Sequence, residues 1–114
     1  MIEVRPTNRG VIRINNSSFW GSCNQIAKIG GSGTVGFSDC TFVQWGAEAG
    51  RAAIQATGGR VLISGCEFRQ KKPHISLGDA EDCAVVTGNV FAGPARIEYS
   101  SRETIQVGLN AASA

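Results

Sequence analysis

The chain has 114 residues, of which 42% are hydrophobic, and it carries a formal net charge of +2. This length and composition are typical of one globular domain with one core. The charge is too small to indicate nucleic acid or an anionic membrane as a partner, and no apolar run approaches the roughly 20 residues that cross a bilayer.

Residues 1–10, MIEVRPTNRG, are expected to form a lead-in to the folded coils. They lack the basic-then-apolar order of a secretory signal peptide. The compartment stays open, and it is extracellular or periplasmic if a longer parent protein is exported. Fifteen glycines against three prolines in the whole chain predict many turns and short strands.

From residue 12 onward an eight-residue pattern recurs five times, beginning at residues 12, 35, 61, 84 and 105. The copies read IRINNSSF, VGFSDCTF, VLISGCEF, AVVTGNVF and IQVGLNAA. Each copy has apolar residues at its first and third positions, two small or polar residues, then Ser, Cys or Asn, and a closing Phe that the last copy replaces with Ala112. A repeat of 21 to 26 residues predicts a solenoid.

The first three positions of each copy alternate as a β-strand requires, so the first and third residues are expected to point inward. The small residues that follow predict a bend, because Gly and Asp tolerate unusual backbone angles. Copies that return in the same direction demand parallel pairing, and the intervening segments are too short and glycine-rich for helical crossovers. We predict an all-β fold: a right-handed parallel β-helix of about five short coils over residues 11–112, in a single domain that spans 1–114.

A second strand recurs less regularly between the copies, in QIAKIGG, AAIQATGG, PHISLGD and ARIEYSS. Its inward residues are expected to be Ala27 and Ile29, Ile54 and Ala56, Ile75 and Leu77, and Ile97 and Tyr99. An outward polar column, one residue per coil, then consists of Lys28, Gln55, Ser76 and Glu98. Its hydrogen-bonding groups suit a linear glycan; the alternative is an ordinary solvated sheet face.

Two further columns are expected inside the coils. One is an aromatic stack of Phe19, Phe42, Phe68 and Phe91. The other is a polar ladder of Ser17, Cys40, Cys66, Asn89 and Asn110, in which the two asparagines bridge their amides along the axis. Neighbouring Cys40 and Cys66 suit either a disulfide or two buried free thiols, while Cys23 and Cys83 are expected to be single thiols in turns.

The variable loops contain the remaining candidate ligand-binding residues. Exposed Trp20 and Trp45 would stack on sugar rings; the alternative is that they shield the core. His74 is the only histidine, and a catalytic role would need a partner base or nucleophile, so a turn or surface position is its alternative. A basic loop surface that suits acidic uronates, or simply solubility, consists of Arg51, Arg69, Lys71 and Lys72.

A second outward column consists of Arg13, Gly36, Leu62, Val85 and Gln106. Two adjacent outward apolar residues, Leu62 and Val85, indicate a covering surface such as another subunit, a terminal segment or a missing domain. Uncapped solenoid ends also invite pairing. We therefore predict a homo-oligomer with Leu62 and Val85 at its interface.

The segments SSFWG, FSDCTFVQW, ISGCEFRQ and VTGNVFAGPARI resemble the pectin-lyase-like superfamily of right-handed parallel β-helices. They are most similar to the C-terminal coils of bacterial proteins described as family 28-related glycoside hydrolases. The resemblance covers residues 11–110 and implies a piece, or a minimal version, of a longer β-helix. Members of the superfamily commonly cleave or bind polysaccharides along an outward groove of one sheet.

Catalysis in the superfamily uses clustered aspartates in the hydrolases, or acidic calcium ligands with an arginine or lysine base in the lyases. The acids of this chain are scattered instead, among them Asp39, Glu48, Glu67, Asp79, Glu81, Asp82 and Glu98. No catalytic residue can therefore be carried over from the superfamily, and the catalytic residues, if there are any, stay unknown. No metal site or cofactor is expected, and calcium enters only under the lyase alternative.

Three functions follow from these patterns. The first is a non-catalytic, carbohydrate-associated β-helix module of a polysaccharide-active protein. The second is a small polysaccharide hydrolase or lyase whose site is assembled at an oligomer interface. The third is a structural or assembly module of a surface or fibre protein.

Overall fold

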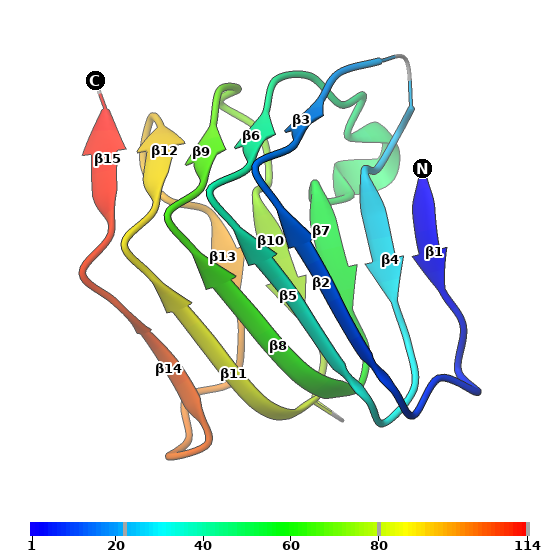
Figure 1. Ribbon diagram of the computed structural model, residues 1–114. Helices are drawn as coiled ribbons and strands as arrows, with labels where there is room; N and C mark the ends of the chain where they lie inside the picture. The colour runs from blue at the N-terminus through cyan, green and yellow to red at the C-terminus, as the bar shows by residue number, and fades with distance from the viewer. Residues whose placement is uncertain (22, 80, 114) are drawn as a thin grey trace.

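The computed structural model describes residues 1–21, 23–79 and 81–113. The chain winds into an all-β parallel solenoid of about five turns, in which three parallel sheets run side by side (Figure 1). The predicted parallel β-helix is thereby confirmed. The described residues contain no helix of the length and apolar character that a membrane crossing requires.

Each turn of the solenoid contributes one strand to each sheet. Sheet A contains, in spatial order, β1 (Ile2–Val4), β4 (Ala27–Ile29), β7 (Ile54–Ala56), β10 (Ile75–Leu77) and β13 (Ile97–Glu98). Sheet B contains β2 (Val11–Asn15), β5 (Thr34–Ser38), β8 (Gly59–Ser64), β11 (Glu81–Thr87) and β14 (Ile105–Gly108). Sheet C contains β3 (Ser18–Phe19), β6 (Thr41–Phe42), β9 (Glu67–Phe68), β12 (Val90–Ala92) and β15 (Ala111–Ser113). A short 3-10 turn, η1 (Glu48–Gly50), precedes β7.

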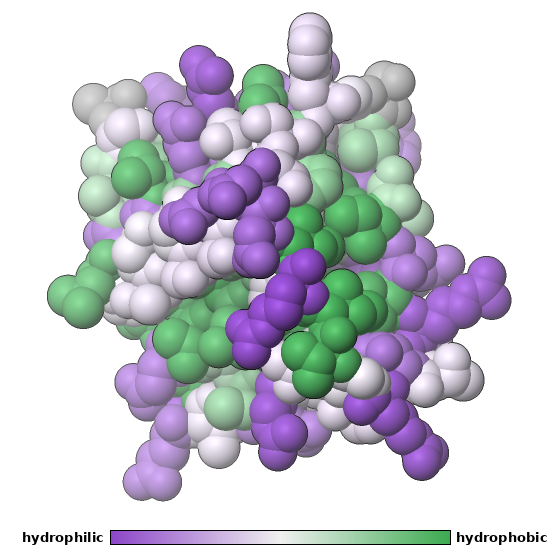
Figure 2. All heavy atoms as spheres, viewed as in Figure 1, coloured by the Kyte–Doolittle hydropathy of each residue, from purple (hydrophilic) through white to green (hydrophobic). Residues whose placement is uncertain are grey.

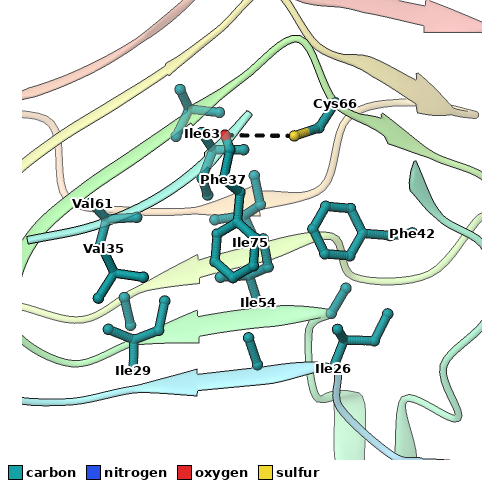
Figure 3. Close-up of a cluster of buried hydrophobic side chains, with 14 of the residues drawn as sticks. Ile26, Ile29, Val35, Phe37, Phe42, Ile54, Val61, Ile63, Cys66 and Ile75 are labelled. Atoms are coloured by element: carbon teal, nitrogen blue, oxygen red, sulfur yellow. Dashed lines mark hydrogen bonds between the residues drawn. The ribbon is translucent and has the colours of Figure 1, made fainter. Parts of the chain in front are cut away.

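The alternation of the repeat gives sheet B its inner and outer faces. In β8, Val61 and Ile63 are buried, whereas Arg60 and Ser64 are exposed. The first predicted inward column is confirmed by the strand register, which aligns Ile12, Val35, Val61, Ala84 and Ile105. The second is confirmed as Ile14, Phe37, Ile63, Val86 and Val107. Apolar residues from all three sheets meet in one core (Figure 3).

The bend between sheets B and C uses the left-handed backbone region in every turn. The residues at this position, with their φ angles, are Asn16 (49°), Asp39 (54°), Gly65 (65°), Gly88 (70°) and Leu109 (54°). Glycine has no Cβ to clash there, and Asn and Asp tolerate the conformation better than other residues. The predicted bend is confirmed, and Leu109 is its one branched apolar occupant.

The closing phenylalanines stack along the axis of the solenoid. Ring centroids lie 5.1 Å apart for Phe19 and Phe42, 4.5 Å for Phe42 and Phe68, and 5.0 Å for Phe68 and Phe91. Interplanar angles of 14°, 12° and 20° make these pairs stacked. The register places Ala112 over Phe91, so the last turn ends the stack with a methyl group.

The polar ladder beside the phenylalanines is also confirmed. Asn110 Oδ1 accepts hydrogen bonds from the backbone N–H and the Nδ2 of Asn89, both at 3.0 Å. Asn89 in turn accepts from the backbone N–H of Cys66 at 2.9 Å. These side chains therefore satisfy backbone groups at the bend, where the regular ladder is interrupted.

The four cysteines are free thiols. The Sγ atom of Cys66 approaches the backbone oxygen of Phe37 at 3.7 Å (Figure 3). Burial raises the pKa of the Cys66 thiol to about 11. At neutral pH this buried thiol is protonated and acts as a small, weakly polar core residue.

Three local expectations differ from the structure. The expected lead-in contains β1, which pairs with β4 in sheet A. Tyr99 was expected to point inward, but 40% of it is exposed, because β13 ends at Glu98 and the chain turns away. Cys83 lies within β11, beside a register shift between Glu81 and Cys83, and not in a turn.

Candidate functional site

The predicted outward column of sheet A exists as one continuous row. The strand register aligns Lys28 with Gln55, Gln55 with Ser76, and Ser76 with Glu98. The row begins one turn earlier than expected, because Glu3 of β1 pairs with Lys28. Polar side chains therefore follow one another along the axis, one per turn, at the roughly 4.8 Å spacing of neighbouring strands.

The last three members of this row line an open groove of about 610 Å³. The groove crosses β7, β10 and β13, and the segment 49–52, which begins within η1, lines its side. Its polar and charged lining residues are Arg51, Gln55, Ser76, Arg96 and Glu98. Lys28 belongs to the same row but does not line the groove.

A buried glutamine supports the wall of the groove from inside. Gln25 is 2% exposed, and its Nε2 donates to Gln55 Oε1 at 3.0 Å and to the backbone oxygen of Ala52 at 3.2 Å. These bonds tie β7 to the segment before it and fix the orientation of the Gln55 amide. Sequence reasoning missed Gln25, whose only signal was a polar residue at the start of the second strand.

His74 lies beneath the groove, inside the core. Its side chain is fully buried and contacts the rings of Phe68, Phe91 and Trp45 at centroid distances of 5.7, 4.8 and 6.1 Å. The expectation of a turn or surface histidine is therefore wrong, and a ligand in the groove does not reach the ring. Consecutive buried residues His74 and Ile75 break the strand alternation, because the chain turns a corner of the coil there.

The hydrogen bonds of His74 fix its tautomer and position a groove residue. The backbone N–H of Arg96 donates to Nδ1 at 3.0 Å, so Nδ1 carries no proton. The Nε2–H group donates to the backbone oxygen of Gln70 at 2.8 Å. Burial lowers the pKa of His74 below the ordinary value of 6.5, and the nearby Arg96 charge acts in the same direction. A neutral His74 thus orients the chain at Arg96.

The two tryptophans occupy opposite environments. Trp45 is fully buried, packs edge-on against Phe68, and donates from Nε1 to the backbone oxygen of Pro73 at 3.2 Å. Of its two expected roles, shielding the core is therefore the one that the structure bears out, because the core covers the faces that sugar stacking would need. Trp20 is 79% exposed, and its Nε1 donates to Gln44 Oε1 at 3.0 Å. It lines a separate hollow with Met1, Ile2, Ser18, Phe19, Cys23 and Ile26.

The predicted basic loop surface is divided by the fold. Arg51 lines the groove, whereas Lys72 donates from Nζ to the backbone oxygen of Trp45 at 2.7 Å and so closes a loop. Arg69 and Lys71 are exposed outside the groove lining. Arg96 was not among the predicted residues, and it replaces Lys71 and Lys72 as the second cation of the groove.

The outer face of sheet B carries the predicted apolar pair. The register aligns Arg13, Gly36, Leu62, Val85 and Gln106 in one row. Leu62 is half-buried and Val85 is 37% exposed. Figure 2 shows apolar side chains gathered on this face with hydrophilic ones between them. A Cβ at Gly36 would meet the side chain of Arg13, so glycine lets that arginine lie along the sheet.

One carboxyl group is buried away from the groove. Glu81 is 1% exposed, and neither of its carboxyl oxygens has a hydrogen-bond partner among the described residues. Burial, with the adjacent charge of Asp82, raises its pKa to about 8 against the pull of Arg102. Among the described residues, no three His, Cys, Asp or Glu side chains gather as a metal site would require.

No family model, curated protein or solved structure matches the chain.

Proposed function

We propose that the chain is a non-catalytic, carbohydrate-associated β-helix module that binds a linear polysaccharide in the groove of sheet A. One observation carries the proposal: Gln55, Ser76 and Glu98, from three successive turns, line a single open groove of about 610 Å³. Ligand sites commonly measure about 300–1,000 Å³, so the groove is large enough for several sugar units.

The lining chemistry matches the hydroxyl groups of a sugar chain. Gln55 and Ser76 each offer a donor and an acceptor, Glu98 accepts, and the two arginines donate from planar groups. A saccharide that runs along the axis meets an equivalent polar position at each turn. The exposed Trp20 lies in another hollow, so the groove does not depend on it.

The resemblance of the repeat segments to pectin-lyase-like β-helices supports a polysaccharide as the ligand class. Within that resemblance the chain corresponds to C-terminal coils, to which no catalytic residue of the superfamily can be carried over. Glu98 is the one carboxylate among the residues that line the groove, whereas glycoside hydrolysis uses a pair of carboxyl groups. Binding is thus the activity that this groove supports best.

The experiment is a binding screen on the purified chain against neutral and acidic polysaccharides, with turnover measured in parallel in the presence and absence of calcium. Arg96→Ala and Glu98→Ala remove groove groups whose side chains are exposed, so the fold should be unaffected. Lys28→Ala is the matched control, because it alters the same row outside the groove. We expect at least a tenfold loss of affinity in the groove variants and none in the control.

The outcomes separate the proposal from its alternatives. Turnover would replace the proposal with an enzyme whose carboxylates converge at a subunit interface. Absence of both binding and turnover would favour a structural module of a surface or fibre protein. Equal losses in Lys28→Ala and Glu98→Ala would place the ligand along the whole row and not in the groove.

A further inference from the structure

A buried glutamine controls which atom of the Gln55 amide can reach a ligand in the groove. Gln25 is 2% exposed and does not line the groove, whereas Gln55 is half-buried and does. The Gln55 side chain ends in one acceptor, Oε1, and one donor group, Nε2. The two hydrogen bonds of Gln25 decide which of these faces a ligand.

This chain of hydrogen bonds begins at the backbone carbonyl of Ala52. A carbonyl oxygen can only accept, so the Gln25 atom that lies 3.2 Å from it must be the donor Nε2. The same Nε2 atom lies 3.0 Å from a terminal atom of Gln55, which must then be the acceptor Oε1. Ala52 therefore fixes the orientation of the Gln25 amide, and Gln25 fixes that of the Gln55 amide.

The remaining group of the Gln55 amide is the one that a ligand can meet. Gln25 precedes β4, on one side of β7, and the groove continues from β7 to β10 and β13 on the other side (Figure 1). With Oε1 held against Gln25, Nε2 is directed toward the groove. Among the residues that the structure describes, none forms a hydrogen bond with this Nε2. Both of its protons are therefore available to a ligand.

The charges along the groove give it two different ends. Arg51 lies in the segment that lines the groove beside β7, and its guanidinium donates hydrogen bonds but never accepts them. Glu98, which can only accept when it is ionised, lies in β13, two strands further along sheet A. The β7 end of the groove therefore offers donors, and the β13 end contains a carboxylate.

We propose that Gln25 is a positioning residue for glycan binding, which makes the β7 end of the groove a donor site for an acceptor oxygen of the sugar chain. The inference rests on the proposed glycan-binding function and adds the chemistry that one end of the groove selects. A sugar substituent with an acceptor oxygen pairs there with Nε2 of Gln55. A substituent that can only donate, such as an ammonium group, leaves Nε2 without a partner and meets the charge of Arg51.

The first test uses no ligand and measures by NMR how fast side-chain amide protons exchange with deuterated water. The Nε2 protons of Gln25 are buried and hydrogen-bonded, so we expect them to exchange slowly and those of Gln55 to exchange fast. In Gln55→Glu a carboxylate oxygen still accepts from Gln25, so slow exchange at Gln25 should persist. Gln55 protons that exchange as slowly as those of Gln25 in the wild type would overturn the proposal.

The second test compares two hexasaccharides of the same backbone, one from chitin and one from chitosan, by isothermal titration calorimetry. The first carries an acetamide oxygen where the second, in a buffer that keeps its amines protonated, carries an ammonium group. We expect the wild type to favour the acetamide sugar by about tenfold, the effect of one net hydrogen bond. Gln55→Glu presents an oxygen in place of Nε2 and should reverse this preference.

Gln25→Met separates positioning from a merely structural role. Methionine fills a similar volume but donates no hydrogen bond, so the Gln55 amide can turn either end toward the groove. We expect the preference for the acetamide sugar to shrink several-fold, while Lys28→Ala, in the same row outside the groove, keeps the wild-type preference. An equal loss of affinity for both sugars in Gln25→Met would assign Gln25 a structural role alone and would overturn the proposal. Gln55→Glu keeps the bond to Gln25 and carries the test if Gln25→Met does not fold.

The two proposals fail in different ways. If neither hexasaccharide nor any polysaccharide of the screen binds, the glycan function falls and the selection falls with it, whereas proton exchange still decides the orientation of the Gln55 amide. If the two sugars bind with the same ratio of affinities in the wild type, Gln55→Glu and Gln25→Met, the glycan function stands and the role of Gln25 is overturned.

Discussion

The backbone N–H of Arg96 donates to Nδ1 of His74 at 3.0 Å, so a buried ring orients a residue that lines the groove. The same ring donates from Nε2 to Gln70 and packs against Phe91. A side chain in the core thereby sets the backbone position of the groove wall. The protonation state of His74 therefore affects both the packing of the core and the position of that wall.

The stability of the protein should depend on the neutral form of His74. Because its pKa is lowered in the folded chain, the unfolded chain takes up a proton near pH 6.5 that the folded chain excludes. The stabilisation is fully present above pH 6.5 and is lost as the pH falls toward the folded value. We expect His74→Gln to cost about 2–4 kcal/mol above that pH through lost packing and to remove this pH dependence. Urea unfolding as a function of pH measures the loss of stability and the pH dependence. Free energies of unfolding that change with pH in parallel for the wild type and His74→Gln would contradict the account.

Glu81 should give the opposite pH dependence. Its pKa is raised in the fold, so its contribution to stability is fully present below pH 4.5 and is lost as the pH rises through about 8. Above pH 8 we expect Glu81→Gln to be more stable than the wild type by about 2 kcal/mol. Asp82→Asn should give a smaller gain, because Asp82 acts only through its charge. Thermal melts below pH 4.5 and above pH 8 test this, and an unchanged difference between wild type and Glu81→Gln would refute it.

The asparagine ladder predicts an order of destabilisation. Asn89→Ala leaves the buried N–H of Cys66 and the carbonyl of Ile63 without partners, and we expect a cost of about 2–3 kcal/mol. Asn110→Ala should cost about half as much, because Asn110 is only half-buried and water can replace its amide. Denaturant midpoints measure the stability of the two variants. A larger loss of stability in Asn110→Ala than in Asn89→Ala would contradict the predicted order.

Leu109 occupies the left-handed position that glycine or a small polar residue fills in the other turns. Its φ is 54° and its side chain is 92% exposed, so it gains little packing in return for the strain. Leu109→Asn should therefore stabilise the protein by about 1 kcal/mol. Gly88→Leu, the reverse change one turn earlier, should destabilise it by a similar amount. Differential scanning calorimetry measures the melting temperatures of the two variants. Shifts of the same sign in both variants would count against this interpretation.

The solenoid was predictable because its determinants are local and recur. The alternation seen at Val61 and Ile63 recurs in each copy, and so does a left-handed residue at the position of Gly65. Each copy therefore meets equivalent positions in its neighbours. Stacking therefore converts a pattern along the chain into columns across the sheets. The outward row was predictable for the same reason, since it lies between two inward positions of a strand.

The loops and corners were not predictable, because no period applies there. Trp20 and Trp45 both follow a phenylalanine, yet Trp45 is buried by Phe68 and the His74 ring, which come from the next turn. Gln25 and Arg96 lie at the corner where the chain enters sheet A. Gln25, Ile26 and Ala27 are all buried, so the strand alternation does not apply at Gln25, whereas Arg96 is exposed. The groove depends on how these segments pack against one another, which the spacing of residues does not encode.

The measurement that tests the central claim most directly is a backbone amide NMR titration of the chain with the polysaccharide that binds best in the screen. The account predicts that shift changes gather at Gln55, Ser76 and Glu98 and at the neighbouring Arg96, while Lys28 and Trp20 stay unchanged. Shift changes that gather instead around the Trp20 hollow, or on the outer face of sheet B, would contradict the assignment of the groove as the glycan site.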